Sequence, residues 1–256
     1  MSITYREHLD AFSRDLTLMC ETVTTTLRAA CYGLTDTSLR SAEEAMTLTD
    51  ELLEIRERCT SRATQLLALE ASKARDVRQV LASIYIIEDF HRMGVLAMHI
   101  ASVARRTYPE PAVAPELMVQ LRTLARLTLD MSEKVHGIVS DPDPEAAVDL
   151  AVDDDAVDSI YDEVMNALRQ DDWSYSPQMA VDMASLVRFF ERYADHTVNV
   201  AQQILFLVTG MKSADYQARR ALGDKPEEIE QASEDTKAAT GFQWPRVIRL
   251  PFKGEN

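Results

Sequence analysis

Two pairs of carboxylates have a spacing that can build an oxygen-lined cation site. Asp154 and Asp158 are four residues apart, and so are Glu191 and Asp195. Side chains four residues apart lie on one face of a helix, one turn above the other. Carboxylate oxygens are the ligands that hard cations prefer, and they also bind borderline ones. If the two helices are neighbours, the four side chains converge, and a bound cation would relieve the repulsion among them.

A simpler interpretation of the same residues is a solvated charged face, partly compensated by Arg188 and Arg192. Glu191 and Asp195 fall opposite the bulky apolar side of their helix. That side is formed by Leu186, Phe189, Phe190, Tyr193 and Ile204. The two carboxylates are therefore expected to point outward or across a shallow groove, and both interpretations stay open at this point.

A rival metal pattern, Glu-x-x-His, occurs at Glu88–His91 and again at Glu133–His136. In di-iron carboxylate bundles, both copies of this motif point into one bundle core. Glu133 points nearly opposite to the apolar side of its helix, which is formed by Leu124, Met131, Val135 and Ile138. The pattern therefore does not favour an oxidase of the ferritin type.

Signatures of common enzymes are absent from the sequence. It contains no GxGxxG, GxxxxGK[ST], GxSxG or HExxH motif, so nucleotide cradles, hydrolase elbows and zincin sites have no support. The formal net charge of −15 argues against a nucleic-acid-binding surface, which needs clustered Lys and Arg. Three cysteines without a CxxC spacing predict reduced core side chains.

The distribution of apolar and charged residues bears on the cellular location of the protein and on its partners. No apolar run approaches the roughly 20 residues that cross a bilayer, and no signal-peptide apolar region is present at the amino terminus. We therefore expect a cytoplasmic protein without direct membrane insertion. Between Asp141 and Asp172, twelve acids face one base, Arg169. Such a region favours attraction to a basic partner surface.

Six long helices are expected to position these side chains, because apolar residues recur every three or four positions. Only 7 Gly and 9 Pro in 256 residues leave room for few turns. The first helix is predicted to stop near Gly33 and the last to close on Gly210, a natural left-handed cap. The predicted helices cover about residues 5–31, 38–69, 75–108, 116–140, 144–170 and 177–209.

The six helices divide as three plus three, and the two halves are similar in sequence. At an offset of about 100 residues, Phe90 matches Phe190, Arg92 matches Arg192 and Ala101 matches Ala201. The pattern predicts a tandem repeat of two three-helix bundles. We assign the first bundle to residues 1–111, the second to 112–210 and a C-terminal extension to 211–256.

The extension differs from the rest of the chain in composition. Its first part, up to about residue 240, predicts a linker or a weak helix. Its last sixteen residues lean basic and are unusually apolar for a chain end, which predicts that they dock onto the body or onto a neighbour. The apolar side chains are Phe242, Trp244, Val247, Ile248, Leu250 and Phe252.

Four runs of residues in this sequence resemble signatures of one protein family. The run FFERYADHTVNVAQQILFLVTG, residues 189–210, resembles a signature of the PhoU family of phosphate-uptake regulators. The runs ARDVRQVLASI, residues 74–84, and HRMGVLAMHIA, residues 91–101, are similar to its other signature, and DDAVDSIY, residues 154–161, resembles its acidic helix. The likeness covers about residues 5–210 in the correct order, and its details are most similar to the actinobacterial members.

The resemblance implies an all-α fold of two tandem three-helix bundles with pseudo-twofold symmetry, here followed by the C-terminal extension. It further implies a cytoplasmic adaptor, typically a homodimer and not an enzyme. Such an adaptor links PstB, the ATPase of the ABC phosphate transporter, to a sensor histidine kinase of the PhoR type. It represses phosphate-starvation genes when phosphate is plentiful.

Family members can carry iron or zinc on the outer face of each bundle. The resemblance therefore assigns Asp154, Asp158, Glu191 and Asp195 to a metal site in the second half. In the first half, His91 and Val95 replace the expected Glu and Asp, and only Asp50 and Glu54 match the acidic helix. We predict at most one well-formed site, in the second bundle, and a degenerate first-half site made of Asp50, Glu54 and His91. The alternative function is a metal-binding carboxylate bundle with an enzymatic or storage role.

Overall fold

The computed structural model describes residues 3–70, 74–170 and 174–224, and every regular element within these ranges is a helix. The apolar, basic end of the extension lies outside the described residues. None of the helices described combines the length and the apolarity needed to span a bilayer. The long helices are α1 (Ile3–Thr35), α2 (Leu39–Glu70), α3 (Ala74–Thr107), α4 (Met118–Ser140), α5 (Pro144–Ala167) and α6 (Pro177–Thr209). The short elements are a 3₁₀ turn, η1 (Pro115–Leu117), and α7 (Ser213–Ala221).

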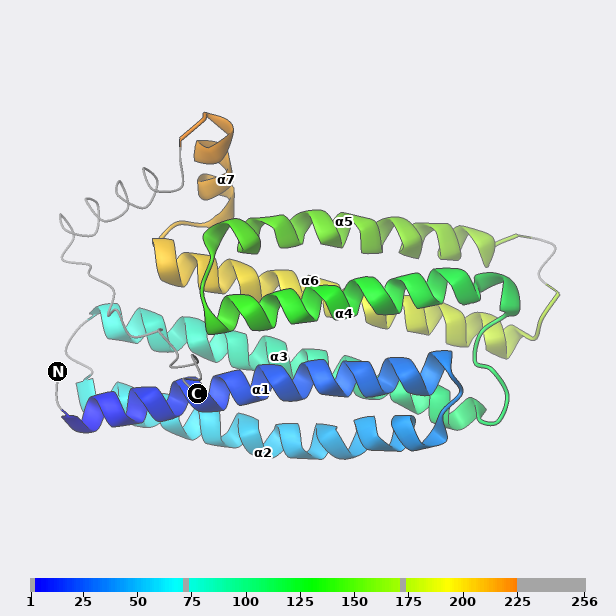
Figure 1. Cartoon of the computed structure of the whole chain (residues 1–256), viewed down its shortest axis with the longest axis horizontal. Coiled ribbons are helices and arrows are strands. Elements are labelled where there is room, and N and C mark those ends of the chain that lie inside the picture. Colours follow the sequence, from blue (N-terminus) through cyan, green and yellow to red (C-terminus); the bar gives the residue numbers. More distant parts are fainter. Residues whose placement is uncertain (1–2, 71–73, 171–173, 225–256) are drawn as a thin grey trace, which may run out of the picture.

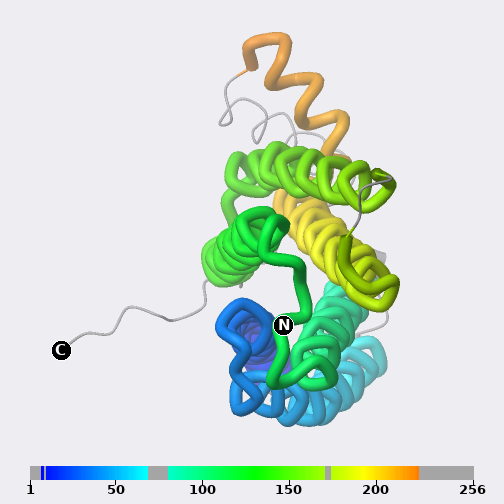
Figure 2. Tube along the Cα trace, turned by 90° about the vertical axis from the view of Figure 1, so that its right-hand side faces the viewer, coloured from blue at the N-terminus to red at the C-terminus, as the bar shows by residue number. Residues whose placement is uncertain are grey.

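The six long helices form two tandem three-helix bundles, as predicted. Helices α1, α2 and α3 pack against one another, and α4, α5 and α6 do the same. Figures 1 and 2 show the two bundles lying along each other, with α1 beside α4 and α3 beside α6. These contacts join equivalent helices of the two repeats, which is the arrangement of a pseudo-twofold. Phe90 and Phe190 are both fully buried, and so are Ala101 and Ala201.

Gly33 and Gly210, the two glycines near which helices were expected to end, have different roles in the structure. The first helix, α1, ends at Thr35, two residues beyond the predicted stop near Gly33. A Cβ at Gly33 would lie 3.0 Å from the backbone nitrogen of Ala42, so this glycine permits the close approach of α1 and α2. Gly210 ends α6 as predicted, with φ of 73° and its N–H bonded to the Phe206 carbonyl.

Local capping sets the beginnings of the two helices that carry the candidate carboxylates. The Asp143 side chain accepts hydrogen bonds from two backbone N–H groups in the first turn of α5, which also contains Pro144. Ser176 accepts from the N–H of Met179 at the beginning of α6. Helix α5 ends at Ala167, three residues earlier than the sequence pattern predicts.

All three cysteines are free and buried, as predicted. Burial raises the pKa of the Cys31 thiol to about 12, and it raises the pKa values of the Cys20 and Cys59 thiols in the same direction. A thiol in this environment stays protonated at neutral pH and is a poor nucleophile. The cysteines therefore serve as small core side chains.

We call the contact between the two bundles the seam. A chain of buried hydroxyl groups crosses it. Ser132 Oγ of α4 lies 2.8 Å from Thr24 Oγ1 of α1 and 3.0 Å from Tyr193 Oη of α6. The Thr24 hydroxyl donates a hydrogen bond to the Cys20 carbonyl oxygen at 3.0 Å. Because each hydroxyl has one proton, Ser132 donates to Thr24 and Tyr193 donates to Ser132. These hydrogen bonds therefore favour the register between α1, α4 and α6 in which the three hydroxyl groups meet.

The chain of buried hydroxyl groups at the seam predicts that two substitutions destabilise the protein to different extents. Ser132→Ala removes the acceptor of the buried Tyr193 hydroxyl and should lower the free energy of unfolding by about 1–3 kcal/mol. Tyr193→Phe removes only the terminal donor and should cost less, about 1 kcal/mol. Urea denaturation measures both. Ser159→Ala, on the exposed face of α5, is the control and should change stability by less than about 0.5 kcal/mol. Equal effects of Ser132→Ala and Ser159→Ala would contradict the assignment.

Candidate functional site

The neighbouring helices α5 and α6 bring the two predicted carboxylate pairs together. Asp154 is half-buried, Asp158 and Asp195 are exposed, and Glu191 retains 18% of its side-chain exposure. Burial raises the pKa of Asp154 to about 6, and the negative charges of Asp158, Asp195 and Glu191 act in the same direction. The four side chains therefore share one electrostatic environment, which we call the α5–α6 carboxylate group.

Two oxygen atoms of this group are buried without a hydrogen-bond partner. They are Asp154 Oδ1 and Glu191 Oε2. Arg188 approaches only the other Glu191 oxygen, at 3.8 Å. Burial raises the pKa values of Glu191 and Asp158 as well, although Arg188 lowers that of Glu191. Buried acceptors without donors are costly, and they have the donor chemistry that a hard or borderline cation needs.

The arrangement of the carboxylates does not yet form a coordination shell. Throughout residues 3–70, 74–170 and 174–224, no group of three or more His, Cys, Asp or Glu side chains is placed to hold a metal ion. The α5–α6 carboxylate group thus fits a cation in ligand type and in charge, but its side chains would have to rotate to meet around one ion.

The first-half residues lie in a different environment. Asp50 and Glu54 are exposed on α2, and His91 is half-buried on α3. Between α2 and α3, Arg56 binds Glu88 at 2.6 Å. Burial lowers the pKa of His91, and the Arg56 guanidinium lowers it further. An arginine therefore supplies the positive charge here, which does not favour an added cation.

The Glu-x-x-His motifs do not converge. Glu88 lies in the first bundle with Arg56, whereas Glu133 is exposed on α4 and binds Arg28 of α1 at 2.7 Å. His136, in the second motif, lies 3.4 Å from Glu21 of α1. The structure thus agrees with the expectation that Glu133 points away from the core of its bundle.

Further polar contacts along the seam could not be predicted from spacing. His196 Nδ1 of α6 lies 2.9 Å from Asp89 Oδ1 of α3, and Arg106 of α3 binds the buried Asp182 of α6 at 2.5 Å. Each pair joins residues that are far apart in the sequence. Only the observed pairing of α3 with α6 brings them together.

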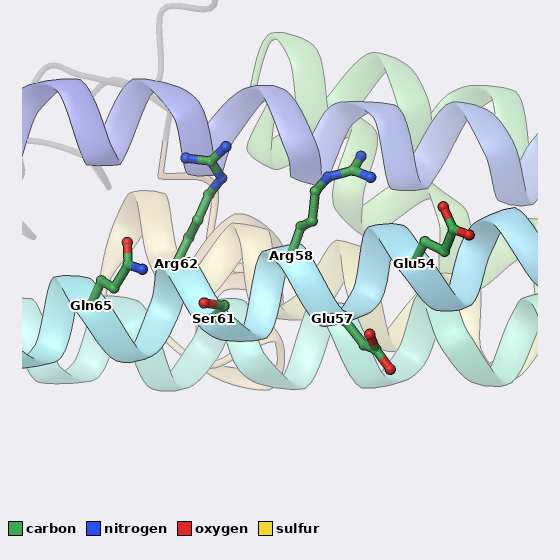
Figure 3. A pocket seen from close by; sticks show the side chains of 6 residues that line it. All are labelled: Glu54, Glu57, Arg58, Ser61, Arg62 and Gln65. Atoms are coloured by element: carbon green, nitrogen blue, oxygen red, sulfur yellow. The ribbon is translucent and has the colours of Figure 1, made fainter.

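An open hollow on the outer surface of α2 was also missed by the sequence analysis. All of its lining residues come from this one helix, and Figure 3 shows Arg58 and Arg62 extending from α2 toward α1. Both arginines pair with Asp15 of α1, at 3.5 and 2.5 Å. The i, i+4 spacing of Arg58 and Arg62 is the only local signal for it. The lining residues are Glu54, Glu57, Arg58, Ser61, Arg62 and Gln65.

Comparison with protein families finds the PhoU domain twice in this chain. The family model matches residues 16–104 and 121–204. A phosphate-specific transport system accessory protein, PhoU homolog 2 of Mycobacterium tuberculosis, is 32% identical over 210 residues, which cover 82% of this chain and 99% of the relative. PhoU homolog 1 of Mycobacterium leprae is 31% identical over 210 residues, covering 82% of this chain and 95% of the relative.

Solved structures with the same fold support this likeness. PhoU from Pseudomonas aeruginosa superposes with a TM-score of 0.74 at 21% identity, covering 81% of this chain and all of that chain. The phosphate transport system regulatory protein PhoU from Streptococcus pneumoniae gives 0.70 at 21% identity, covering 81% of this chain and 98% of that chain. At this level of identity, the two superpositions show the shared fold.

The raised pKa of Asp154 predicts a pH-dependent stability. The folded state holds a proton on this carboxyl between its ordinary pKa of 3.8 and about pH 6, so stability is lost as the pH rises through this window. Asp154→Asn should therefore unfold at higher denaturant concentration than the wild type at pH 7.5, by about 1 kcal/mol after allowance for partial exposure. The advantage should shrink toward pH 4.5. Urea titrations with a chelator present measure both.

Asp141→Asn, in the exposed turn before α5, is the matched control and should show no such pH-dependent gain. A wild-type-like stability profile for Asp154→Asn would contradict the raised pKa of Asp154.

Proposed function

This chain belongs to the PhoU family, and we propose from this premise that it is an accessory and regulatory protein of phosphate-specific transport. The observation that carries the proposal is a match covering 82% of this chain and 99% and 95% of two mycobacterial relatives that are named accessory proteins of that system. We infer that the protein acts through contacts with other proteins and not through catalytic turnover. Long exposed helix faces supply such contact surfaces.

In its specific form, the proposal is an adaptor on the cytoplasmic side of the membrane. The protein would link the PstB ATPase of the phosphate transporter to a PhoR-type sensor histidine kinase and repress phosphate-starvation genes when phosphate is plentiful. A homodimer is the proposed assembly. The acidic stretch between Asp141 and Asp172 supports attraction to a basic partner patch, which speeds encounter and weakens with salt.

Deletion of the gene tests this proposal directly. In phosphate-rich medium, a reporter of phosphate-starvation genes should rise to the level seen in starved wild-type cells, because the kinase loses its inhibition. Complementation with the wild-type gene should restore repression. Affinity capture from phosphate-replete cells should recover the kinase or the transporter ATPase. An unchanged reporter in the deletion strain would refute the regulatory role.

We further propose that the α5–α6 carboxylate group binds iron or zinc after side-chain rotation. The two buried oxygens without partners, on Asp154 and Glu191, support this proposal because a cation would satisfy them. Burial raises the pKa of Asp154 to about 6, and the negative charges of Asp158, Asp195 and Glu191 raise it in the same direction; a cation would relieve this repulsion. Metal with turnover, or many ions per chain, would instead favour the enzymatic or storage alternative.

The metal proposal predicts a difference between the two halves. The double variant Asp154→Asn/Asp195→Asn should reduce bound iron or zinc to background in elemental analysis of the purified full chain, because two oxygen ligands lose their charge. The matched double variant Asp50→Asn/Glu54→Gln, on the first bundle, should retain the wild-type content. Wild-type protein without stoichiometric metal after loading with Zn²⁺ or Fe²⁺, or equal losses in both variants, would refute the second-half site.

A further inference from the structure

The C-terminal extension is attached to the beginning of α5 through α7. Tyr216 is fully buried and donates a hydrogen bond to Glu145 at 2.8 Å. Arg220 contacts the other Glu145 oxygen at 2.8 Å and Asp149 at 3.5 Å. Figure 1 shows α7 projecting from the end of the second bundle, next to the first turns of α5. A cation of the extension therefore already pairs with acids of α5.

This extension lies beyond the residues that the family model matches. The family match ends at residue 204, and the Mycobacterium tuberculosis relative is covered over 99% of its length by only 82% of this chain. The contacts of Tyr216 and Arg220 thus lie outside the residues that the family model matches. They call for a role of their own.

The acids that Arg220 contacts begin a line of side chains along α5. Successive members are four or three residues apart, so they lie in one row on the helix surface. Beyond Asp149, the row is exposed, and Val152 retains 68% of its accessible area. Asp155 and Asp162 are exposed beside it. We call this surface the α5 row; it consists of Glu145, Asp149, Val152, Ala156, Ser159 and Glu163.

The end of the chain has the complementary composition. Residues 211–256 contain eight bases and eight acids, so the net charge of −15 is carried by residues 1–210. Within residues 242–253, Arg246, Arg249 and Lys253 alternate with apolar side chains, and no acid is present. The segment therefore offers positive charge and apolar surface to a row with acids around an exposed valine and an alanine.

We propose that residues 242–253 dock on the exposed part of the α5 row and cover this acidic face of the second bundle. The inference concerns the chain alone and does not depend on the proposed function.

The connection is long enough for this contact. Residues 225–241 can span at most about 55–60 Å when extended, whereas the 24 residues of α5 are about 36 Å long. A tether of this length gives an effective concentration in the millimolar range, which favours a contact within one chain. An anionic membrane is the other surface that a basic, aromatic segment binds, but the strongly negative body would be repelled from it.

Tryptophan fluorescence of the full-length protein tests the proposal. The chain has two tryptophans, and Trp173→Phe leaves Trp244 as the only one. We expect blue-shifted emission and weak quenching by acrylamide in low salt. Adding Asp155→Asn and Asp162→Asn should shift the emission to the red and raise the quenching constant about twofold, since the contact depends on charge. Arg246→Glu with Arg249→Glu should give the same change without altering α5.

The control carries the same change of charge elsewhere: Glu43→Gln with Glu44→Gln, both exposed on α2, should leave emission and quenching unchanged. Four outcomes overturn the proposal. The first is quenching equal to that of a free peptide of residues 240–256, and the second is an equal effect of the α2 and α5 variants. The third is a dependence of the emission on protein concentration, which would indicate docking on a second copy. The fourth is a blue shift that occurs only with phosphatidylglycerol vesicles, which would indicate binding to a membrane.

Discussion

The packing of α1 against α4 and of α3 against α6 is the constraint on which the structure depends. Helices of more than 30 residues bury an apolar face only if a partner runs beside them, and the seam supplies this partner to both bundles. The seam is not purely apolar. The buried chain from Tyr193 through Ser132 to Thr24 is satisfied in one register only, so it contributes specificity beyond its small net stabilisation.

The sequence predicted those features that are encoded locally. Pro177 and Gly210 mark the two ends of α6, and the match of Phe90 with Phe190 indicated the repeat. The packing role of Gly33 could not be predicted, because it comes from the approach of Ala42, a contact between helices. For the candidate site, the spacing of four residues placed each carboxylate pair on one face, but it could not reveal the buried oxygens, which arise only where α5 meets α6.

The two halves share a scaffold but differ in their electrostatics. Between α2 and α3, Arg56 compensates Glu88, and burial and that arginine lower the pKa of the neighbouring His91. Between α5 and α6, the corresponding surface has an excess of carboxylates, and Asp154 retains a proton to unusually high pH. Duplication thus preserved the apolar positions that hold the helices together, while the outer faces diverged. If the protein acts through contacts with other proteins, as proposed, these outer faces are the surfaces on which the two halves can differ in partner.

The burial of Tyr216 also affects how this protein can evolve. Its ring belongs to the apolar core, and its hydroxyl is bonded to Glu145 of α5. A chain truncated before Tyr216 would lose a large aromatic side chain from its interior and leave a Glu145 oxygen without its donor. The extension is in this way an integral part of the folded core, and a chain that ended before Tyr216 would need compensating substitutions around the vacated space.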